Sequence, residues 1–191
     1  MSRTTQQTKK ALIIVDMQND FVRQTGSLYV GGSEELIEPI KRLMTDPSNA
    51  WDLIVFTQDW HPDSHRSFET FPIHCVQNTP GAEIVSELRQ HQSLPQITWQ
   101  KAFMRHTDSL SAFTNDEGVC TGLCAILRTY QISDVYVAGV ATEYCVKETA
   151  VGSASFGFRT FVRTDLIRAF DPSQSKPTLS ELEQRGIELI H

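Results

Sequence analysis

The chain has 191 residues, of which 40% are hydrophobic and 21% are charged. These proportions are those of an ordinary folded globular protein, and they exclude a disordered, collagen-like or coiled-coil chain. The formal net charge of -6 leaves no surplus of basic side chains for the phosphate contacts that dominate nucleic-acid binding. We therefore expect neither nucleic acid nor an anionic membrane surface among the partners.

The first nine residues are polar, and we expect residues 1–9 to form a flexible tail before a single domain over residues 10–191. The apolar run 11–15 (ALIIV) is too short for the core of a signal peptide or for a membrane span. The four cysteines, without secretory features, favour reduced thiols over a disulfide framework. These features predict a cytoplasmic protein, and self-association into a homo-oligomer is left open.

Short β-branched runs alternate with helix-length segments, a pattern typical of parallel strands joined by helical crossovers. Strands are predicted at residues 11–16, 52–57, 96–99, 135–139, 160–163 and 186–190. Helices are predicted at 33–44, 82–88, 121–130, 143–156 and 178–185, with Ser33 and Thr178 as caps and 171–177 as a polar loop. The predicted fold class is α/β, a three-layer α/β/α, Rossmann-like domain around a six-stranded, mainly parallel sheet.

Ionisable and nucleophilic side chains follow the ends of four predicted strands. Functional sites in open parallel sheets lie just beyond the carboxyl ends of the strands, so these side chains should meet at one edge. In chain order they are Asp16, Asp59 with His61, Lys101 and Cys145.

The segment after the second predicted strand has the composition of a metal site. Asp59 and His61 lie two residues apart, which in an extended segment points both side chains to one side. His74, on a later loop, would complete a three-ligand oxygen and nitrogen set that suits zinc, iron or manganese and leaves positions open for water or substrate. His65 and Glu69 are reserve ligands. The alternative is a solvated polar loop, but three histidines in one 14-residue window favour the metal.

Cys145 lies at the start of a predicted helix, directly after the fourth strand and a turn of small residues. A helix N-terminus favours negative charge, so this position predicts a lowered thiol pKa and a nucleophilic cysteine. The backbone amides there could also hold an oxyanion formed when the thiolate attacks a carbonyl. The alternative is a buried structural cysteine.

Asp16 and Lys101 are expected at the same edge as this thiol. Asp16 could take the thiol proton as a base, although it could also be a turn or capping carboxylate. Lys101 could stabilise negative charge on the carboxylate, the thiolate and the intermediate, although most lysines are simply exposed. The presence of both favours a catalytic role for the cysteine.

The other cysteines have a plainer interpretation. Cys120 and Cys124 are four residues apart and are predicted on one helix face, and Cys75 follows His74. Core packing explains all three, and ligation of the metal by Cys75 is left open.

Several long motifs, in order, resemble those of the nicotinamidase/pyrazinamidase family of the isochorismatase-like cysteine hydrolases, from about Ala11 to the C-terminus. ALIIVDMQNDF is similar to the family's first strand and TQDWHPDSHRSF to its metal loop. FPIHCVQNTPGAEI is similar to the segment with the last metal histidine, WQKAFMRHTDSLSAF to the lysine segment and VAGVATEYCVKETA to the nucleophile segment.

The resemblance implies a catalytic triad of Asp16, Lys101 and Cys145. It also implies one divalent metal ion, with zinc expected before iron or manganese, bound by Asp59, His61 and His74. The fourth position is left open, and His65 or Glu69 could serve there, directly or through water. A cis peptide bond between Val140 and Ala141 is implied as well, turning the Ala141 amide toward the Cys145 amide to form the oxyanion hole.

The resemblance further implies that the metal receives the pyridine nitrogen of the substrate while aromatic side chains enclose its ring. The implied substrate-binding residues are Phe21, Gln18, Phe71, Val140 and Leu110. Two of them depart from the family pattern, because Phe71 replaces a usual tryptophan and Leu110 a frequent tyrosine.

The expected activity is hydrolysis of nicotinamide to nicotinate and ammonia through a cysteine thioester, feeding NAD salvage, with pyrazinamide as a second substrate. The alternatives are a related N-carbamoyl amidohydrolase or isochorismatase, which lacks the Asp59, His61 and His74 set, and a non-catalytic metal-binding interaction domain.

Overall fold

The computed structural model describes residues 8–89 and 95–191. Residues 1–7 of the predicted tail 1–9 lie outside the described residues, and its last two positions, 8 and 9, lie within them. The second of these, Lys9, is held in place because its carbonyl accepts hydrogen bonds from the amides of Ser133 and Asp134, at 2.9 and 3.2 Å.

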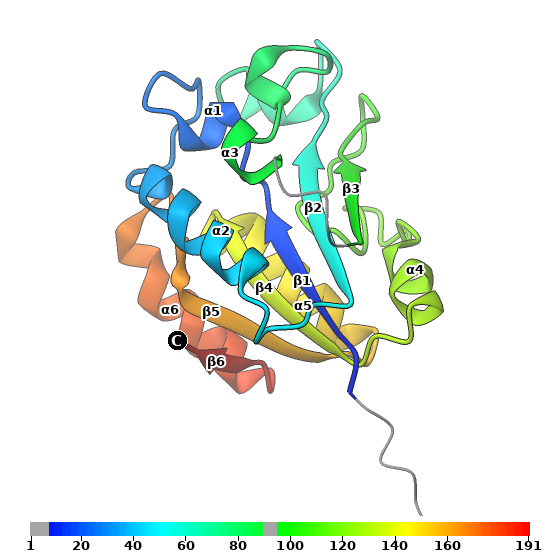
Figure 1. Ribbon diagram of the computed structural model, residues 1–191. Helices are drawn as coiled ribbons and strands as arrows, with labels where there is room; N and C mark the ends of the chain where they lie inside the picture. Colours follow the sequence, from blue (N-terminus) through cyan, green and yellow to red (C-terminus); the bar gives the residue numbers. More distant parts are fainter. Residues whose placement is uncertain (1–7, 90–94) are drawn as a thin grey trace, which may run out of the picture.

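A six-stranded sheet in the order β3-β2-β1-β4-β5-β6 forms the centre of the fold, and every pairing in it is parallel. The predicted class is therefore confirmed, with a sheet that is entirely parallel (Figure 1). The strands are β1 (Lys10–Val15), β2 (Leu53–Asp59), β3 (Gln96–Lys101), β4 (Asp134–Val140), β5 (Arg159–Arg168) and β6 (Glu188–Ile190).

Helices cover both faces of this sheet. The α-helices are α1 (Asn19–Val22), α2 (Ile37–Thr45), α3 (Ser86–Arg89), α4 (Leu123–Thr129), α5 (Lys147–Ser155) and α6 (Pro172–Gln184). Short 3-10 helices are η1 (Ser33–Leu36), η2 (Arg66–Glu69) and η3 (Pro80–Ala82), and η4 (Thr142–Val146) is a wide, irregular turn.

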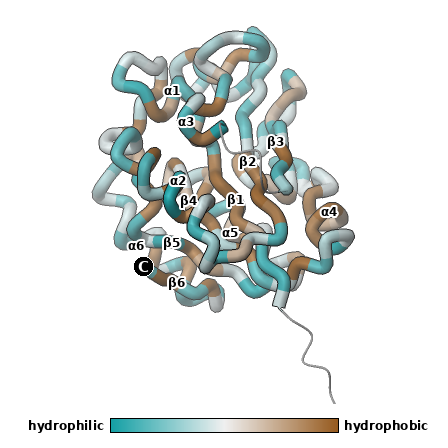
Figure 2. The backbone as a smooth tube through the Cα atoms, viewed as in Figure 1, coloured by the Kyte–Doolittle hydropathy of each residue, from teal (hydrophilic) through white to brown (hydrophobic). Residues whose placement is uncertain are grey.

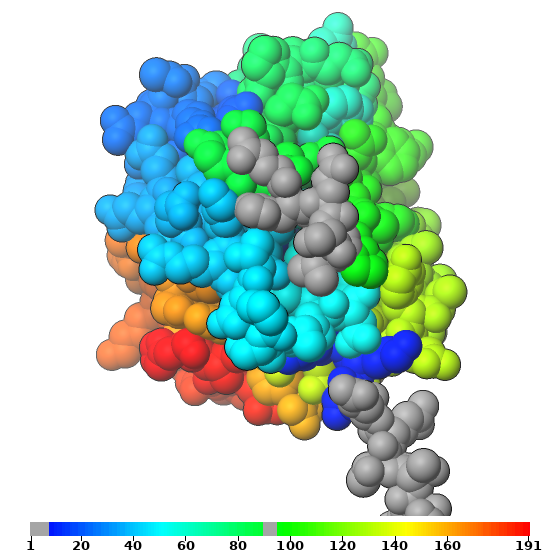
Figure 3. All heavy atoms as spheres, viewed as in Figure 1, coloured from blue at the N-terminus to red at the C-terminus, as the bar shows by residue number. Residues whose placement is uncertain are grey.

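The alternation of side chains along β1 builds two apolar layers. Leu12 and Ile14 pack with α2, whereas Ile13 and Val15 pack with α4, α5 and α6. All four side chains are fully buried, as expected for a central parallel strand covered on both faces. Figure 2 shows the central strands as the most hydrophobic part of the chain, and Figure 3 shows the side chains of α2 and the segment after it covering one face.

Four details of the predicted helices are wrong, namely the start of the last helix, the loop before it and the two caps, since Thr178 lies inside α6. The helix predicted to begin at Thr178 begins at Pro172, so the predicted polar loop 171–177 is mostly helical. Asp171 caps this helix by accepting from the Ser173 amide, and Pro172 fits its first turn because that position needs no N–H donor. Ser33 is not a cap, because its hydroxyl donates to the carbonyl of Phe21 instead.

Within the described residues, no helix is long and apolar enough to cross a membrane.

Candidate active site

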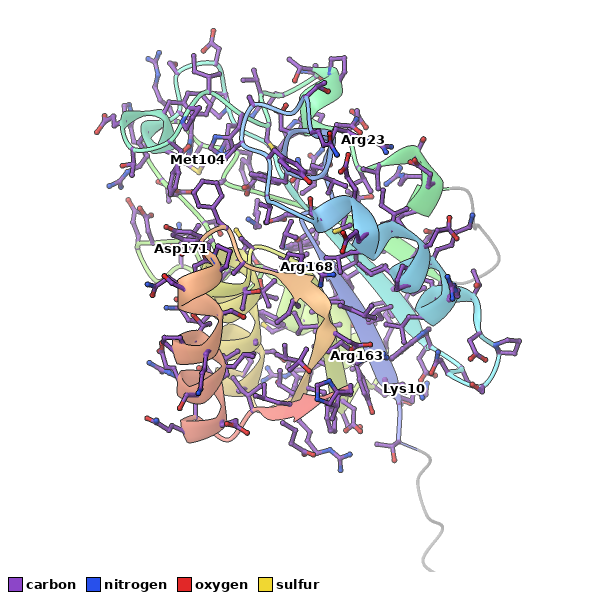
Figure 4. All side chains as sticks on the ribbon, turned by 90° about the vertical axis from the view of Figure 1, so that its left-hand side faces the viewer. Lys10, Arg23, Met104, Arg163, Arg168 and Asp171 are labelled. Atoms are coloured by element: carbon purple, nitrogen blue, oxygen red, sulfur yellow. The ribbon has the colours of Figure 1, made fainter. Side chains whose placement is uncertain are left out.

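The carboxyl ends of the four neighbouring strands β3, β2, β1 and β4 meet at one edge of the sheet, and each contributes side chains there. Asp16 directly follows β1, Asp59 ends β2 and Lys101 ends β3, while Cys145 follows β4 through the η4 turn. Asp59 and Lys101 are direct partners in the register of β2 and β3. In Figure 4 this edge lies toward Arg23 and Met104, and Lys10, at the amino end of β1, lies at the opposite end.

Lys101 is the centre of this group. Its Nζ lies 2.9 Å from Asp16 Oδ2, 2.5 Å from Asp59 Oδ1 and 3.5 Å from Cys145 Sγ. The side chain is 1% exposed, and a buried ammonium is tolerated only where opposite charges and hydrogen bonds compensate its lost hydration. Lys101 therefore links the expected acid-base residue, the expected nucleophile and the expected metal site.

The charges of these groups fix their protonation. Burial lowers the pKa of Lys101, but the carboxylates of Asp16 and Asp59 outweigh burial, so this pKa is well above its ordinary value. Burial raises the pKa of Asp59, yet Lys101 and His61 outweigh that effect and hold its pKa far below the ordinary value. Lys101 is thus a permanent cation and Asp59 a permanent anion at neutral pH.

The pKa of Asp16 is shifted in the opposite direction to that of Asp59. Burial raises its pKa and exceeds the lowering by Lys101, which suits a carboxylate that must accept a proton. Its Oδ1 accepts a 2.6 Å hydrogen bond from the Thr57 hydroxyl. Its Oδ2 has the Lys101 ion pair but no aligned hydrogen bond within the described residues, so this oxygen has room for a proton. The sequence reasoning missed Thr57, although a hydroxyl in an otherwise apolar run of strand was a signal.

The expected lowering of the Cys145 pKa is wrong for the protein without substrate. Burial raises the pKa of this thiol well above its ordinary value, and Lys101 only partly offsets the rise. The side chain is 6% exposed and lies within the irregular η4 turn, two residues before α5 begins at Lys147. Desolvation therefore outweighs the helix N-terminus, and the thiol needs a nearby base to become a nucleophile.

The cis peptide bond expected between Val140 and Ala141 is present, and both residues line the pocket beside Cys145. The preceding Gly139 has a φ of 117°, and a Cβ there would lie 2.1 Å from the Val15 carbonyl oxygen. Only glycine allows β4 to approach β1 this closely at the site.

Asp59, His61 and His74 form one buried cluster whose ligand atoms all lie within 4.8 Å of one another. His61 Nδ1 lies 3.1 Å from the Ala102 carbonyl oxygen, and His74 Nδ1 lies 2.7 Å from that of Pro72. Each Nδ1 must donate to its carbonyl, so the Nε2 of each neutral imidazole keeps a lone pair. Two imidazole nitrogens and a carboxylate are a donor set that fits a divalent metal ion.

The two reserve ligands lie outside this cluster. His65 Nδ1 accepts from the Ser67 amide, and its Nε2 donates to the Thr107 carbonyl, so neither nitrogen has a free lone pair. Glu69 is exposed and lines a neighbouring surface hollow. Cys75 is fully buried in the core beside α2 and α3, and its Sγ is not part of the cluster.

A largely apolar pocket opens over the thiol and the metal cluster. Its lining includes four of the five predicted substrate-binding residues, namely Phe21, Phe71, Val140 and Leu110. Sequence reasoning missed the remaining wall, which consists of Leu28, Val30, Ser67, Asp108, Tyr144 and Phe170. Tyr144 stands edge-on to Phe71, with ring centroids 5.7 Å apart. Its place beside Cys145 in the sequence was the available signal.

The prediction that Gln18 contacts the substrate is wrong. Its Oε1 accepts from the Asp59 amide at 2.8 Å, and its Nε2 donates to the carbonyls of Asp59 and Ala82 at 2.8 and 2.7 Å. The side chain is fully buried and does not line the pocket. Gln18 instead fixes the backbone of Asp59 on both sides of its Cα.

This fold and these side chains at its carboxyl edge point to a class of enzyme, the hydrolases that use a cysteine thiol on a parallel α/β scaffold. Residues 10–191 match the model of the Isochorismatase domain, and the chain belongs to this family.

The similar proteins include nicotinamidases. The nicotinamidase of Saccharomyces cerevisiae is 34% identical, over 95% of this chain and 99% of that protein. The structure of PnC1 from L. infantum in complex with nicotinate has a TM-score of 0.90 and 37% identity, over 96% of this chain and 92% of the other. The pyrazinamidase of Pyrococcus horikoshii in complex with zinc has a TM-score of 0.83 and 36% identity, over 96% and 99% of the two chains.

Proposed function

We propose that the protein hydrolyses nicotinamide to nicotinate and ammonia and so supplies NAD salvage. The observation that carries this proposal is the single buried group in which Lys101 contacts Asp16, Asp59 and Cys145 at once. It joins a thiol and its base to a metal cluster under one largely apolar pocket. Nicotinamidases from yeast and bacteria align over nearly the whole chain, which supports the same substrate here.

The first half of the reaction uses Asp16 as the base. Asp16 takes the thiol proton of Cys145, and Lys101 stabilises the resulting thiolate 3.5 Å away. The thiolate attacks the carboxamide carbon, and the backbone amides of Ala141 and Cys145 stabilise the oxyanion. Asp16 then returns its proton to the departing nitrogen, so ammonia leaves and a thioester remains.

The second half removes the acyl group. Asp16, again ionised, takes a proton from a water molecule that attacks the thioester carbon. The same two backbone amides stabilise the second oxyanion, and collapse of this intermediate releases nicotinate and the thiol. Burial raises the pKa of Asp16, which makes it a better proton acceptor than an exposed aspartate.

The proposed metal ligands are Asp59, His61 and His74, and zinc is the proposed ion. A bound divalent ion would supply a Lewis-acid point for the pyridine nitrogen of the substrate. The two imidazoles and one carboxylate suit zinc, and the zinc complex of the similar pyrazinamidase supports this choice over iron or manganese. Elemental analysis of purified protein distinguishes the three metals.

We also propose that pyrazinamide is a substrate, because its ring carries a nitrogen in the same position relative to the carboxamide. Phe21, Phe71 and Tyr144 would enclose either ring. A cytoplasmic location is proposed because all four cysteines are free. Assembly into a homo-oligomer is a prediction that size-exclusion chromatography tests.

An ammonia-release assay tests the function. Native and metal-stripped protein are compared on nicotinamide, pyrazinamide, benzamide and an N-carbamoyl amide. We expect turnover of the first two by native protein, with loss on stripping and recovery on adding zinc. Preference for the N-carbamoyl amide, or full activity without metal, would favour one of the relatives that lack the metal site.

A further inference from the structure

Outside the proposed active site, two thiols lie in contact at the start of α4. Cys120 Sγ and Cys124 Sγ are 3.4 Å apart, and both cysteines are free. We propose that Cys120 and Cys124 are a site of reversible oxidation by peroxide, which joins them in a disulfide. The hydrolase reaction uses neither residue, so this modification is independent of the proposed function.

The surroundings of Cys120 and Cys124 allow the two sulfurs to approach and form a disulfide. A disulfide needs a sulfur separation of about 2.05 Å, so the two atoms must approach by about 1.4 Å. Cys124 is 7% exposed and held in the first turn of α4. Cys120 instead ends a small hairpin, where it is bridged to Thr114, and residues 116–120 are all exposed. The hairpin can supply the movement without disturbing the core.

Accessibility and hydrogen bonding assign different roles to the two sulfurs. Cys120 is exposed, and its Sγ accepts from the Gly122 amide at 3.4 Å, which holds the sulfur at the surface. Burial raises the pKa of Cys124, and the neighbouring Cys120 raises it further. Cys120 is therefore the sulfur that meets the oxidant, and Cys124 is the sulfur that completes the bond.

The chemistry balances with hydrogen peroxide as the oxidant. The Cys120 thiolate attacks one peroxide oxygen, the O–O bond breaks, and a sulfenic acid and hydroxide form. The Cys124 sulfur then attacks the Cys120 sulfur, the S–O bond breaks, and the hydroxyl leaves as water with the Cys124 proton. Two thiols and one peroxide thus give one disulfide and two waters, and a dithiol reductant reverses the change.

The other two cysteines are poor competitors for this reaction. All four lie in the described part of the chain, and Cys120 is the exposed one among them. Cys75 is fully buried and Cys145 is 6% exposed. Burial raises the pKa of both thiols well above the ordinary value, which suppresses the reactive thiolate.

Trp99 provides a local reporter, because α4 lies on the β3 side of the sheet (Figure 1). Its Nε1 donates to Thr121 Oγ1 at 3.3 Å, and a Cβ on Gly122 would come 3.9 Å from the Trp99 ring. Both neighbours lie between the two cysteines in sequence. A disulfide beside this ring quenches its fluorescence, because disulfides accept electrons from excited indole.

The test treats reduced, full-length protein with one equivalent of hydrogen peroxide and then alkylates the remaining thiols under denaturing conditions. We expect two of the four thiols to escape alkylation. The tryptic peptide 106–128, which contains both cysteines, should lose two hydrogens, and dithiothreitol should restore them. Tryptophan emission should fall on oxidation in wild type and much less in Trp99→Phe. In Trp99→Phe, two of the four thiols should still escape alkylation, as in wild type.

Single variants test the assigned roles. In Cys124→Ser the sulfenic acid on Cys120 should persist and react with dimedone, whereas in Cys120→Ser the remaining Cys124 should stay fully alkylatable. Cys145→Ala should form the disulfide as wild type does, which separates this result from the hydrolase proposal. Four alkylatable thiols after peroxide, or a disulfide that maps to Cys75 or Cys145, would overturn the proposal.

Discussion

Lys101 Nζ lies 2.9 Å from Asp16 Oδ2, and the same ammonium lies 2.5 Å from Asp59 Oδ1. One buried cation therefore neutralises both the proposed proton acceptor and a proposed metal ligand. The two halves of the site share this charge, so a change at Lys101 should affect turnover, metal binding and stability together.

Replacement of Lys101 by Met removes the cation and leaves two buried carboxylates without their partner. Breaking a buried ion pair in this way typically costs about 3 to 5 kcal/mol, so we expect the free energy of unfolding to fall by that order. Ammonia release should fall at least 100-fold. Urea denaturation and the ammonia assay measure the two effects. Lys176→Met, at an exposed position of α6, is the matched control and should change neither.

The acid limb of the activity profile should report Asp16. As base it acts in its ionised form, so activity rises as pH rises through its pKa, which burial places above the ordinary aspartate value. The Thr57 hydroxyl donates to the ionised form, so Thr57→Val should raise this pKa further and move the limb of kcat/KM to higher pH. The profile is measured at saturating zinc. Thr45→Val, on the exposed end of α2, should leave the limb in place, and an unmoved limb in Thr57→Val would argue against Asp16 as the base.

Gln18→Leu should weaken metal binding without touching a metal ligand. The variant loses the amide that holds both the N–H and the carbonyl of Asp59. Loss of such an outer partner typically lowers metal affinity about 10- to 100-fold. Competition with a chromophoric chelator measures the affinity, and thermal unfolding checks the fold. The control is Gln24→Leu, because Gln24 is an exposed side chain whose amide donates to the half-buried Glu34, away from the metal cluster. Equal zinc affinity in both variants would contradict a role of Gln18 in metal binding and leave it with a packing role alone.

Gly139→Ala tests the close approach of β4 to β1. The new Cβ would lie 2.1 Å from the Val15 carbonyl oxygen, so the strands must separate at the site. Gly157→Ala is a close control, because its φ of 87° is also positive but a Cβ there meets no atom within 4 Å. A positive φ alone costs about 1 to 3 kcal/mol. We expect a larger loss of unfolding free energy in Gly139→Ala, and equal losses would contradict the role of the close approach.

Much of the fold was predictable because parallel strands are nearly continuous apolar runs between helix-length segments. The strands β1 and β2 have this form and were predicted to within two residues. The start of α6 was missed because Pro177 and the polar residues before it are typical of loops. Asp171 and Pro172 instead supply a cap and a first turn, and burial of Leu182 fixes the rest of the helix.

The proposed site was predictable where side chains follow strand ends, as Asp16, Lys101 and Cys145 do. The pKa shifts of these side chains could not be predicted from the sequence. The sign of the Cys145 pKa shift depends on burial against the charge of Lys101, and neither is visible in a sequence. Gln18 was misassigned because a polar residue beside a catalytic segment can bond to substrate or to backbone, and only the distances to Asp59 decide between them.

The thioester on Cys145 is the most direct measure of the proposed reaction. Wild-type protein mixed with nicotinamide and quenched in acid within the first turnovers is analysed by intact mass and peptide mapping. The account predicts a nicotinoyl group on the peptide that contains Cys145, its disappearance as ammonia release is completed, and neither adduct nor ammonia with folded Cys145→Ala. Steady ammonia release by folded Cys145→Ala, or an acyl group on another residue, would contradict it.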